Sequence, residues 1–162
     1  SFSRVVPSFY MENFLGMLKP SKGPDGNLTI TLPEMGAVPM GVTSVDAIGG
    51  VAAAAFADPE GWNGRTAPIG GDELTVAQLA KGLADVTGLT VNPYSPPTAV
   101  YKDFFPGAKE MADMFTFYAK YLVDRSPAKT SAVYPGNVSF KTWTEQHADE
   151  LKKTFQAVLD AK

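Results

Sequence analysis

The first twenty residues change from a strand pattern to a helix pattern. Phe2, Val5 and Val6 lead to Pro7, which predicts a strand over residues 2–7. Apolar residues then recur near helical spacing up to Pro20, which predicts a helix over residues 9–19. A strand that runs into a helix places its last side chains above the carboxyl edge of a sheet, where α/β proteins bind ligands.

The next stretch predicts another strand and a longer helix. Residues 28–32 alternate strictly between apolar and polar, and a short extended piece follows at residues 38–40. Ser44 precedes a predicted helix over residues 45–57, whose expected buried face is Val45, Ile48, Ala52, Ala55 and Phe56. Two glycines inside this helix, Gly49 and Gly50, each cost about 1 kcal/mol relative to alanine. We therefore expect the helix to lie close to a strand or a ligand there.

The second half continues the alternation of strands and helices. Pro68 places a predicted strand over residues 65–69 at a sheet edge. Thr75 and Gln78 form a capping box that opens a helix over residues 76–86, and Gly88 ends it. The remaining predictions are a strand at 89–91, an irregular or helical piece at 98–105, a helix at 108–122, a loop at 124–138 and a final helix at 140–160 capped by Ser139. This order predicts an α/β fold.

Composition narrows the class of protein. The length of 162 residues is typical of one domain, and a net charge of −3 argues against direct binding of nucleic acid. The absence of cysteine excludes disulfides and thiolate sites, and no apolar run approaches the roughly 20 residues of a membrane span. We expect a cytoplasmic protein, with the nucleus as the alternative, and no contact with a membrane.

Several catalytic motifs are missing from the sequence. There is one histidine, His147, in the apolar stripe of the last helix, which favours a packed or rim position over a ligand or base. There is no Gly-x-Ser-x-Gly turn, no glycine-rich nucleotide loop and no Tyr-x-x-x-Lys pair. Too few histidines and cysteines are present for a zinc site. Catalytic residues therefore stay unknown, and we expect no metal site.

The strand-to-helix junction holds the best candidate residues, Tyr10, Met11, Glu12 and Asn13. In one interpretation they form a helix N-terminus, where Glu12 complements the dipole and Asn13 bonds locally. In the other, Tyr10 and Asn13 face the crevice and bind an amide or a sugar. The residues alone favour neither interpretation.

A succession of motifs resembles the NmrA-like family of atypical short-chain dehydrogenases/reductases. The matching segments are Pro7-Ser8-Phe9-Tyr10-Met11-Glu12-Asn13-Phe14, Lys22-Gly23-Pro24-Asp25-Gly26, Val38-Pro39-Met40, Ser44-Val45-x-x-Ile48-Gly49, Asp58-Pro59-Glu60, Phe105-Pro106-Gly107-Ala108, Met114-Phe115-x-Phe117-Tyr118 and Trp143-x-Glu145-Gln146-His147. The similarity extends to the subgroup typified by a human NADPH-sensing member. It covers nearly the whole chain, in order.

The resemblance implies a fold and a cofactor. This sequence is similar to the carboxyl-terminal part of a Rossmann-type NAD(P)-binding fold, without the amino-terminal nucleotide-binding half. Residues 1–20 then supply a late Rossmann strand and helix, and residues 21–162 supply the substrate-type subdomain and the closing helices. Tyr10, Met11, Glu12 and Asn13 match the family segment that borders the nicotinamide end of NADP(H).

The implied function is that of a redox sensor or an NAD(P)H-dependent oxidoreductase, and the resemblance does not decide between them. The alternative is an interaction or small-ligand module that has lost nucleotide binding. We expect NADP(H) to bind the full-length protein, and this chain alone weakly or not at all, because the glycine turn that grips phosphate is absent. A second copy or the missing half is expected to cover the strand at 2–7.

Overall fold

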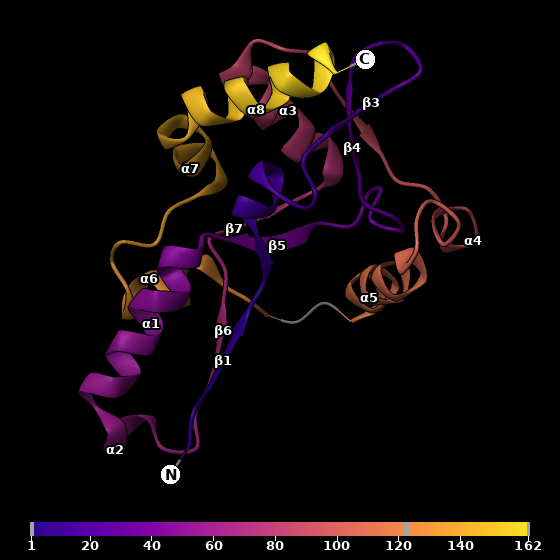
Figure 1. Cartoon of the computed structure of the whole chain (residues 1–162). Helices are drawn as coiled ribbons and strands as arrows, with labels where there is room; N and C mark the ends of the chain where they lie inside the picture. Colours follow the sequence, from indigo (N-terminus) through magenta and orange to yellow (C-terminus); the bar gives the residue numbers. More distant parts are fainter. Residues whose placement is uncertain (1, 122–123, 162) are drawn as a thin grey trace. The chain divides into compact units, whose positions relative to one another are not determined.

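A computed structural model describes residues 2–121 and 124–161 and confirms the α/β class (Figure 1). The chain divides into two compact units that interleave along the sequence. The first unit comprises Ser1–Glu12, Gly41–Glu73 and Val123–Trp143, and the second comprises Asn13–Met40, Leu74–Leu122 and Thr144–Lys162. Each unit is therefore built from three separate stretches of chain.

The first unit contains two sets of strands with helices beside them. Its elements are β1 (Arg4–Pro7), β2 (Phe9–Tyr10), β5 (Met40–Thr43), α1 (Val45–Ala57), α2 (Pro59–Trp62), β6 (Thr66–Ile69), β7 (Asp72–Leu74), α6 (Pro127–Val133) and the start of α7 (Phe140–Gln146). The strands β1 and β6 pair in parallel, with Arg4 opposite Thr66 and Pro7 opposite Ile69. The order in the other sheet is β2-β5-β7.

The core of the first unit forms where α1 packs against β1, β6 and α6 (Figure 1). Its buried members are Ala47, Val51, Trp62 and Ile69. The predicted buried face of α1 was wrong at both ends, because Val45 is 45% exposed and Phe56 is 86% exposed. The face that packs is centred on Ala47 and Val51, one turn apart.

The two glycines of α1 differ in their surroundings. A Cβ added at Gly50 would meet the ring of Tyr134, so a close approach exists at this position, but to an aromatic side chain at the end of α6 and not to the strand or ligand that was expected. A Cβ added at Gly49 would meet nothing within 4 Å. Only Gly50 is therefore required by packing.

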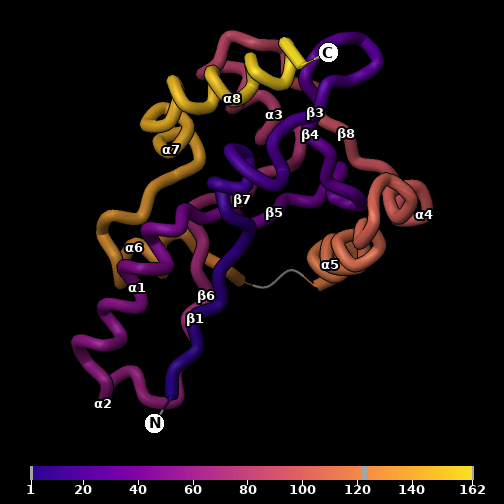
Figure 2. Tube along the Cα trace, viewed as in Figure 1, coloured from indigo at the N-terminus to yellow at the C-terminus, as the bar shows by residue number. Residues whose placement is uncertain are grey.

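The second unit is a three-stranded sheet with helices. Its elements are the rest of η1 (Met11–Leu15), β3 (Ser21–Lys22), β4 (Leu28–Thr31), α3 (Val76–Thr87), β8 (Val91–Tyr94), α4 (Thr98–Tyr101), α5 (Ala108–Lys120) and α8 (Ala148–Asp160). The strand β4 pairs antiparallel with β3 and parallel with β8. The helices α3 and α8 lie side by side and pack near β4 and β8 (Figure 2).

The capping box of α3 is confirmed in full. The Thr75 hydroxyl accepts a hydrogen bond from the Gln78 backbone N–H, and the Gln78 side chain accepts one from the Thr75 N–H at 2.8 Å. The helix ends at Gly88, whose φ of 71° lies in the left-handed region that favours glycine. Local signals alone therefore fix both ends of this helix.

The helix predicted over residues 9–19 is wrong. Phe9 and Tyr10 form a short strand, and only a 3₁₀ turn over Met11–Leu15 follows. The apolar spacing that suggested a helix instead reflects Phe9, Met11 and Phe14, which are all buried although they do not lie on one helix. Pairing of Phe9 and Tyr10 with β5, distant in sequence, overrides the local pattern.

Two further boundaries differ from the prediction. The expected loop at 124–138 contains α6, because Pro127 occupies the first turn of the helix and Ser126 caps it. The expected helix at 140–160 is two helices that are separated at His147, whose φ of −109° and ψ of 16° are not helical. Leu122, predicted to end the helix that is seen as α5, lies outside the described residues.

Candidate functional site

Two parallel strands of the first unit end side by side. Phe9 lies opposite Val42 and Tyr10 opposite Thr43. After Tyr10 the polypeptide enters η1, and after Thr43 it enters α1 through Ser44. This is the kind of edge at which open α/β sheets bind ligands.

Tyr10 is the residue of this edge that a ligand can reach. Its side chain is 38% exposed, whereas the preceding Phe9 is buried at 6%. The two side chains leave opposite faces of the strand, because side chains alternate along β structure. The ring of Tyr10 therefore offers a partly exposed aromatic surface at the end of β2.

Met11 faces the interior of the unit and is fully buried. A Cβ added at Gly71 would lie 3.2 Å from the Met11 Cε and 2.5 Å from the Val138 carbonyl oxygen. Met11 and the turn after β6 are thus packed too closely for any larger residue at position 71. The side chain of Met11 supports the edge from behind.

Glu12 connects three distant segments. Its Oε1 accepts a hydrogen bond from the Val45 backbone N–H at 3.1 Å and another from the Trp143 indole Nε1 at 3.1 Å. The Ser44 side chain makes no cap bond, so Glu12 serves the N-terminus of α1 in its place. The Oε2 atom is buried and has no partner within the described residues.

Asn13 belongs to the second unit and is half-buried. Its carbonyl accepts hydrogen bonds from the Gly16 N–H at 3.2 Å and the Leu18 N–H at 3.0 Å. Its side-chain amide makes no hydrogen bond within residues 2–121 and 124–161. The local side-chain bond expected of a helix-capping asparagine is therefore not seen.

Two residues near this edge were missed by the sequence analysis. Ser8 follows β1 and is 3% exposed, with a hydroxyl that has no partner among the described residues. Trp143 was named only as part of a segment that resembles the family, although its indole N–H donates to Glu12. A buried indole N–H needs an acceptor, and that was the available signal, but the sequence does not say which of 17 acidic residues supplies it.

The turn between β6 and β7 is held by hydrogen bonds between its backbone and two side chains. The Gly70 N–H donates to the Thr130 hydroxyl at 3.0 Å, and the Gly70 carbonyl accepts from the Asn137 amide at 3.1 Å. A Cβ at Gly70 would collide with the Arg125 carbonyl oxygen. Gly70 is therefore a turn glycine that packing requires.

The other candidates from the sequence lie elsewhere. His147 is half-buried at the break before α8, which fits a rim position. The aromatic residues of the segment Met114–Tyr118 in α5 differ in exposure, because Phe115 is fully buried while Phe117 is 50% exposed; Tyr121, just after the helix, is 60% exposed. No cluster of three or more potential metal ligands forms among the described residues. Nor, in that same part of the chain, is any helix long and apolar enough to cross a bilayer.

Solved structures of three proteins resemble this fold. One is a nucleoside-diphosphate-sugar epimerase from Staphylococcus aureus, with a TM-score of 0.68 and 15% identity, matched over 87% of this chain and 50% of that one. NmrA, a negative transcriptional regulator in complex with NADP, gives 0.66 and 15% over 96% of this chain and 52% of that one. The triphenylmethane reductase of Citrobacter sp. complexed with NADP(H) has a TM-score of 0.67 and 18% identity, matched over 88% of this chain and 51% of that one.

The chain spans about half the length of these solved structures, and at such low identity the likeness shows the fold alone. The sequence itself supplies stronger evidence, since the model of the NmrA-like family matches residues 1–153. That match runs through both compact units and includes the edge formed by Tyr10 and Glu12. The chain therefore belongs to the NmrA-like family.

Proposed function

We propose that this chain carries the nicotinamide-side wall of an NADP(H) site in a redox sensor or reductase-related protein, similar to the human NADPH-sensing subgroup. The observation that carries the proposal is the exposed Tyr10 at the shared end of two parallel strands. An NADP complex of NmrA and an NADP(H) complex of triphenylmethane reductase, which have similar folds, support it.

The four residues have different roles in this proposal. Tyr10 and Asn13 touch the cofactor, the first through its ring and the second through its amide. Met11 and Glu12 hold the segment in place, because one is fully buried and the other bonds both Val45 and Trp143. The residues present therefore fit one end of the cofactor, and the phosphate grip has to come from a preceding half of the fold.

The partition of the fold is part of the same proposal. Residues 1–20 correspond to a late Rossmann strand with the turn that follows it, and residues 21–162 to the substrate-type subdomain with the closing helices. The chain is then the carboxyl-terminal part of the protein, and its compartment is the cytoplasm. Bound cofactor would supply or accept a hydride, while the residues described here orient its nicotinamide ring.

A titration with NADPH tests the proposal. The protein extended to the length of its relatives should bind NADPH, with energy transfer from tryptophan to the dihydronicotinamide as a direct readout. The isolated 162 residues should bind weakly or not at all. Absence of binding by the extended protein would refute the cofactor role and favour the alternative of an interaction module that has lost nucleotide binding.

Substitution of Asn13 tests the site itself. Asn13→Ala in the extended protein should weaken NADPH binding about tenfold, through loss of one hydrogen bond to the ligand, with little change in melting temperature. Asn63→Ala, at an exposed asparagine after α2, is the matched control. An unchanged dissociation constant for Asn13→Ala would remove this residue from the site.

A further inference from the structure

A second concave site lies within the first unit, apart from the strand ends. It is a cavity of about 330 Å³ beside β6, between α6 and the side chains of α1 and α2. Val51, Trp62, Ile69 and Val133 are among its apolar walls, and Arg65 and Lys129 are its two cations. None of Tyr10, Met11 and Glu12 lines it. Its volume lies at the lower end of the range for small-molecule sites.

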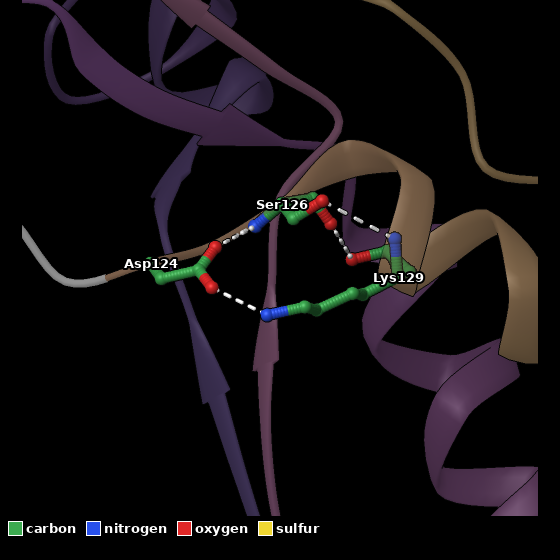
Figure 3. A network of polar contacts seen from close by, with 4 residues as sticks. Asp124, Ser126 and Lys129 are labelled. Atoms are coloured by element: carbon green, nitrogen blue, oxygen red, sulfur yellow. Dashed lines mark hydrogen bonds and ion pairs between the residues drawn. The ribbon is translucent and has the colours of Figure 1, made fainter.

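The two cations differ in whether a carboxylate neutralises their charge. The Lys129 ammonium forms an ion pair with the Asp124 carboxylate, and Figure 3 shows the two groups pointing toward one another. Asp124 also accepts from the Ser126 N–H at 3.2 Å, which holds the carboxylate at the start of α6. The charge of Lys129 is thus largely compensated from within the chain.

Arg65 keeps its charge uncompensated. Its guanidinium lies 4.7 Å from the centroid of the Trp62 ring and donates one bond, at 3.4 Å, to the Gly61 carbonyl. It has no carboxylate partner among the described residues, and no acidic residue lines the cavity. Stacking on Trp62 fixes the plane of the guanidinium, and its remaining N–H groups are free to bind an anion.

We propose that this cavity binds a small amphipathic carboxylate, such as an arylalkanoic acid. The apolar part lies against Val51, Ile69 and Val133, and the carboxylate takes a paired hydrogen bond from the planar fork of Arg65. One uncompensated cation over apolar walls matches a monoanion. A phosphate dianion would bring a second negative charge, and the only other cation of the lining, Lys129, is already paired with Asp124. This site is independent of the nucleotide role proposed above.

Binding of a matched set of probes to the 162-residue chain tests the proposal. The probes are 4-phenylbutyrate, the neutral 4-phenyl-1-butanol and the cationic 4-phenylbutylamine, followed by calorimetry and by tryptophan fluorescence. The acid should saturate the protein and bind about tenfold more tightly than the alcohol, because only the acid forms a charge-assisted pair with Arg65. The amine should bind less well than the alcohol.

Three variants assign the interaction to named residues. Arg65→Gln should weaken binding of the acid about tenfold and leave binding of the alcohol unchanged. Asp124→Asn removes the carboxylate that pairs with the Lys129 ammonium, and it should therefore tighten binding of the acid. Ala132→Phe, on an exposed lining residue of α6, should fill the cavity and weaken both ligands. Lys153→Gln, on the exposed face of α8 in the other unit, is the control for loss of one positive charge.

The outcomes separate clearly. Equal affinities for the acid and the alcohol, or an acid affinity that Arg65→Gln leaves unchanged, would overturn the proposal. So would a failure of the acid to saturate the protein at tens of millimolar. Circular dichroism of each variant shows whether it is folded, and a folded Asp124→Asn that binds the acid no more tightly also counts against the assignment.

Discussion

Single carboxylates decide much of the local structure of this chain. Glu12 replaces the cap that Ser44 does not provide, and it orients the Trp143 indole at the same time. Glu34 has the same kind of role in the second unit, where its Oε1 accepts the backbone N–H of Thr98, the first residue of α4, at 2.6 Å. In both cases one acidic side chain joins segments that are distant in sequence.

Removal of the Glu12 carboxylate should destabilise the first unit. Glu12→Ala leaves the Val45 N–H and the Trp143 indole without their acceptor, which should cost about 2 to 3 kcal/mol in free energy of unfolding by urea. Glu12→Gln keeps an acceptor oxygen and should cost less than half as much. Glu110→Ala, at an exposed acid in the first turn of α5, should change stability little. Equal losses for Glu12→Ala and Glu12→Gln would contradict the acceptor role.

Glu34 should make stability depend on acid. The hydrogen bond from the Thr98 N–H lowers the pKa of Glu34 below its usual 4.5. A carboxyl whose pKa is lower in the folded state stabilises the fold above the unfolded pKa, and that contribution is lost as pH falls through the folded value.

Urea titrations at two pH values check this expectation. Glu34→Gln should be less stable than the wild type at pH near 7, and the difference should shrink as pH falls from the usual pKa of 4.5 through the lower pKa of the folded state. Glu34 is exposed, so the effect should be modest. If the difference in stability between Glu34→Gln and the wild type is the same at both pH values, it does not arise from ionisation of Glu34.

At the scale of elements, the sequence predicted those that local signals determine and missed those that depend on distant contacts. The capping box and terminal glycine of α3 lie within the helix and its flanks, so the sequence predicted both ends. The 3₁₀ turn after Tyr10 could not be predicted, because it depends on pairing of β2 with β5, in which Phe9 lies opposite Val42 and Tyr10 opposite Thr43. The helix α6 was read as a loop because Pro127 signals both a break and a helix start.

The candidate site shows the same division. The sequence pointed to Tyr10–Asn13 as a segment, since a strand pattern ends there. It could not show that Met11 is buried or that Glu12 bonds Val45 and Trp143, because those facts depend on packing against residues far along the chain.

The glycine pair of α1 gives a matched test of helix packing. Gly49→Ala should stabilise the protein by about 0.5 to 1 kcal/mol, because the site is open and alanine favours helix. Gly50→Ala should destabilise it by about 1 to 3 kcal/mol, because the new methyl group meets the Tyr134 ring. Thermal unfolding of both variants compares them directly. If both substitutions stabilise the protein, the contact between α1 and Tyr134 is not tight.

At the scale of the whole molecule, the most notable surface is the apolar groove beside β1. Phe2 is 66% exposed and Phe56 is 86% exposed, and both line a groove of about 250 Å³ together with Val5. Among the described residues β1 pairs only with β6, so its other edge has backbone groups available for pairing. An aromatic groove beside an open strand edge is typical of a surface that another chain or segment covers.

The isolated chain should therefore associate at high concentration. Light scattering of the 162 residues should show a mass that rises with concentration, and Phe56→Lys should reduce this rise without loss of melting temperature. Phe117→Lys, which removes an exposed aromatic from α5 in the second unit, is the matched control. A monomer at every concentration with one cooperative unfolding transition would count against the prediction.

The hydrogen bond between Glu12 and Trp143 can form only late in synthesis on the ribosome. The two residues are 131 positions apart, so at roughly 5 to 20 residues per second the Glu12 carboxylate waits about 7 to 26 s for its partner to be made. The strand β1 likewise waits for β6. The nascent chain thus presents an unpaired strand at Arg4–Pro7 until β6 has been made, and a chaperone that binds extended segments has its opportunity in that interval.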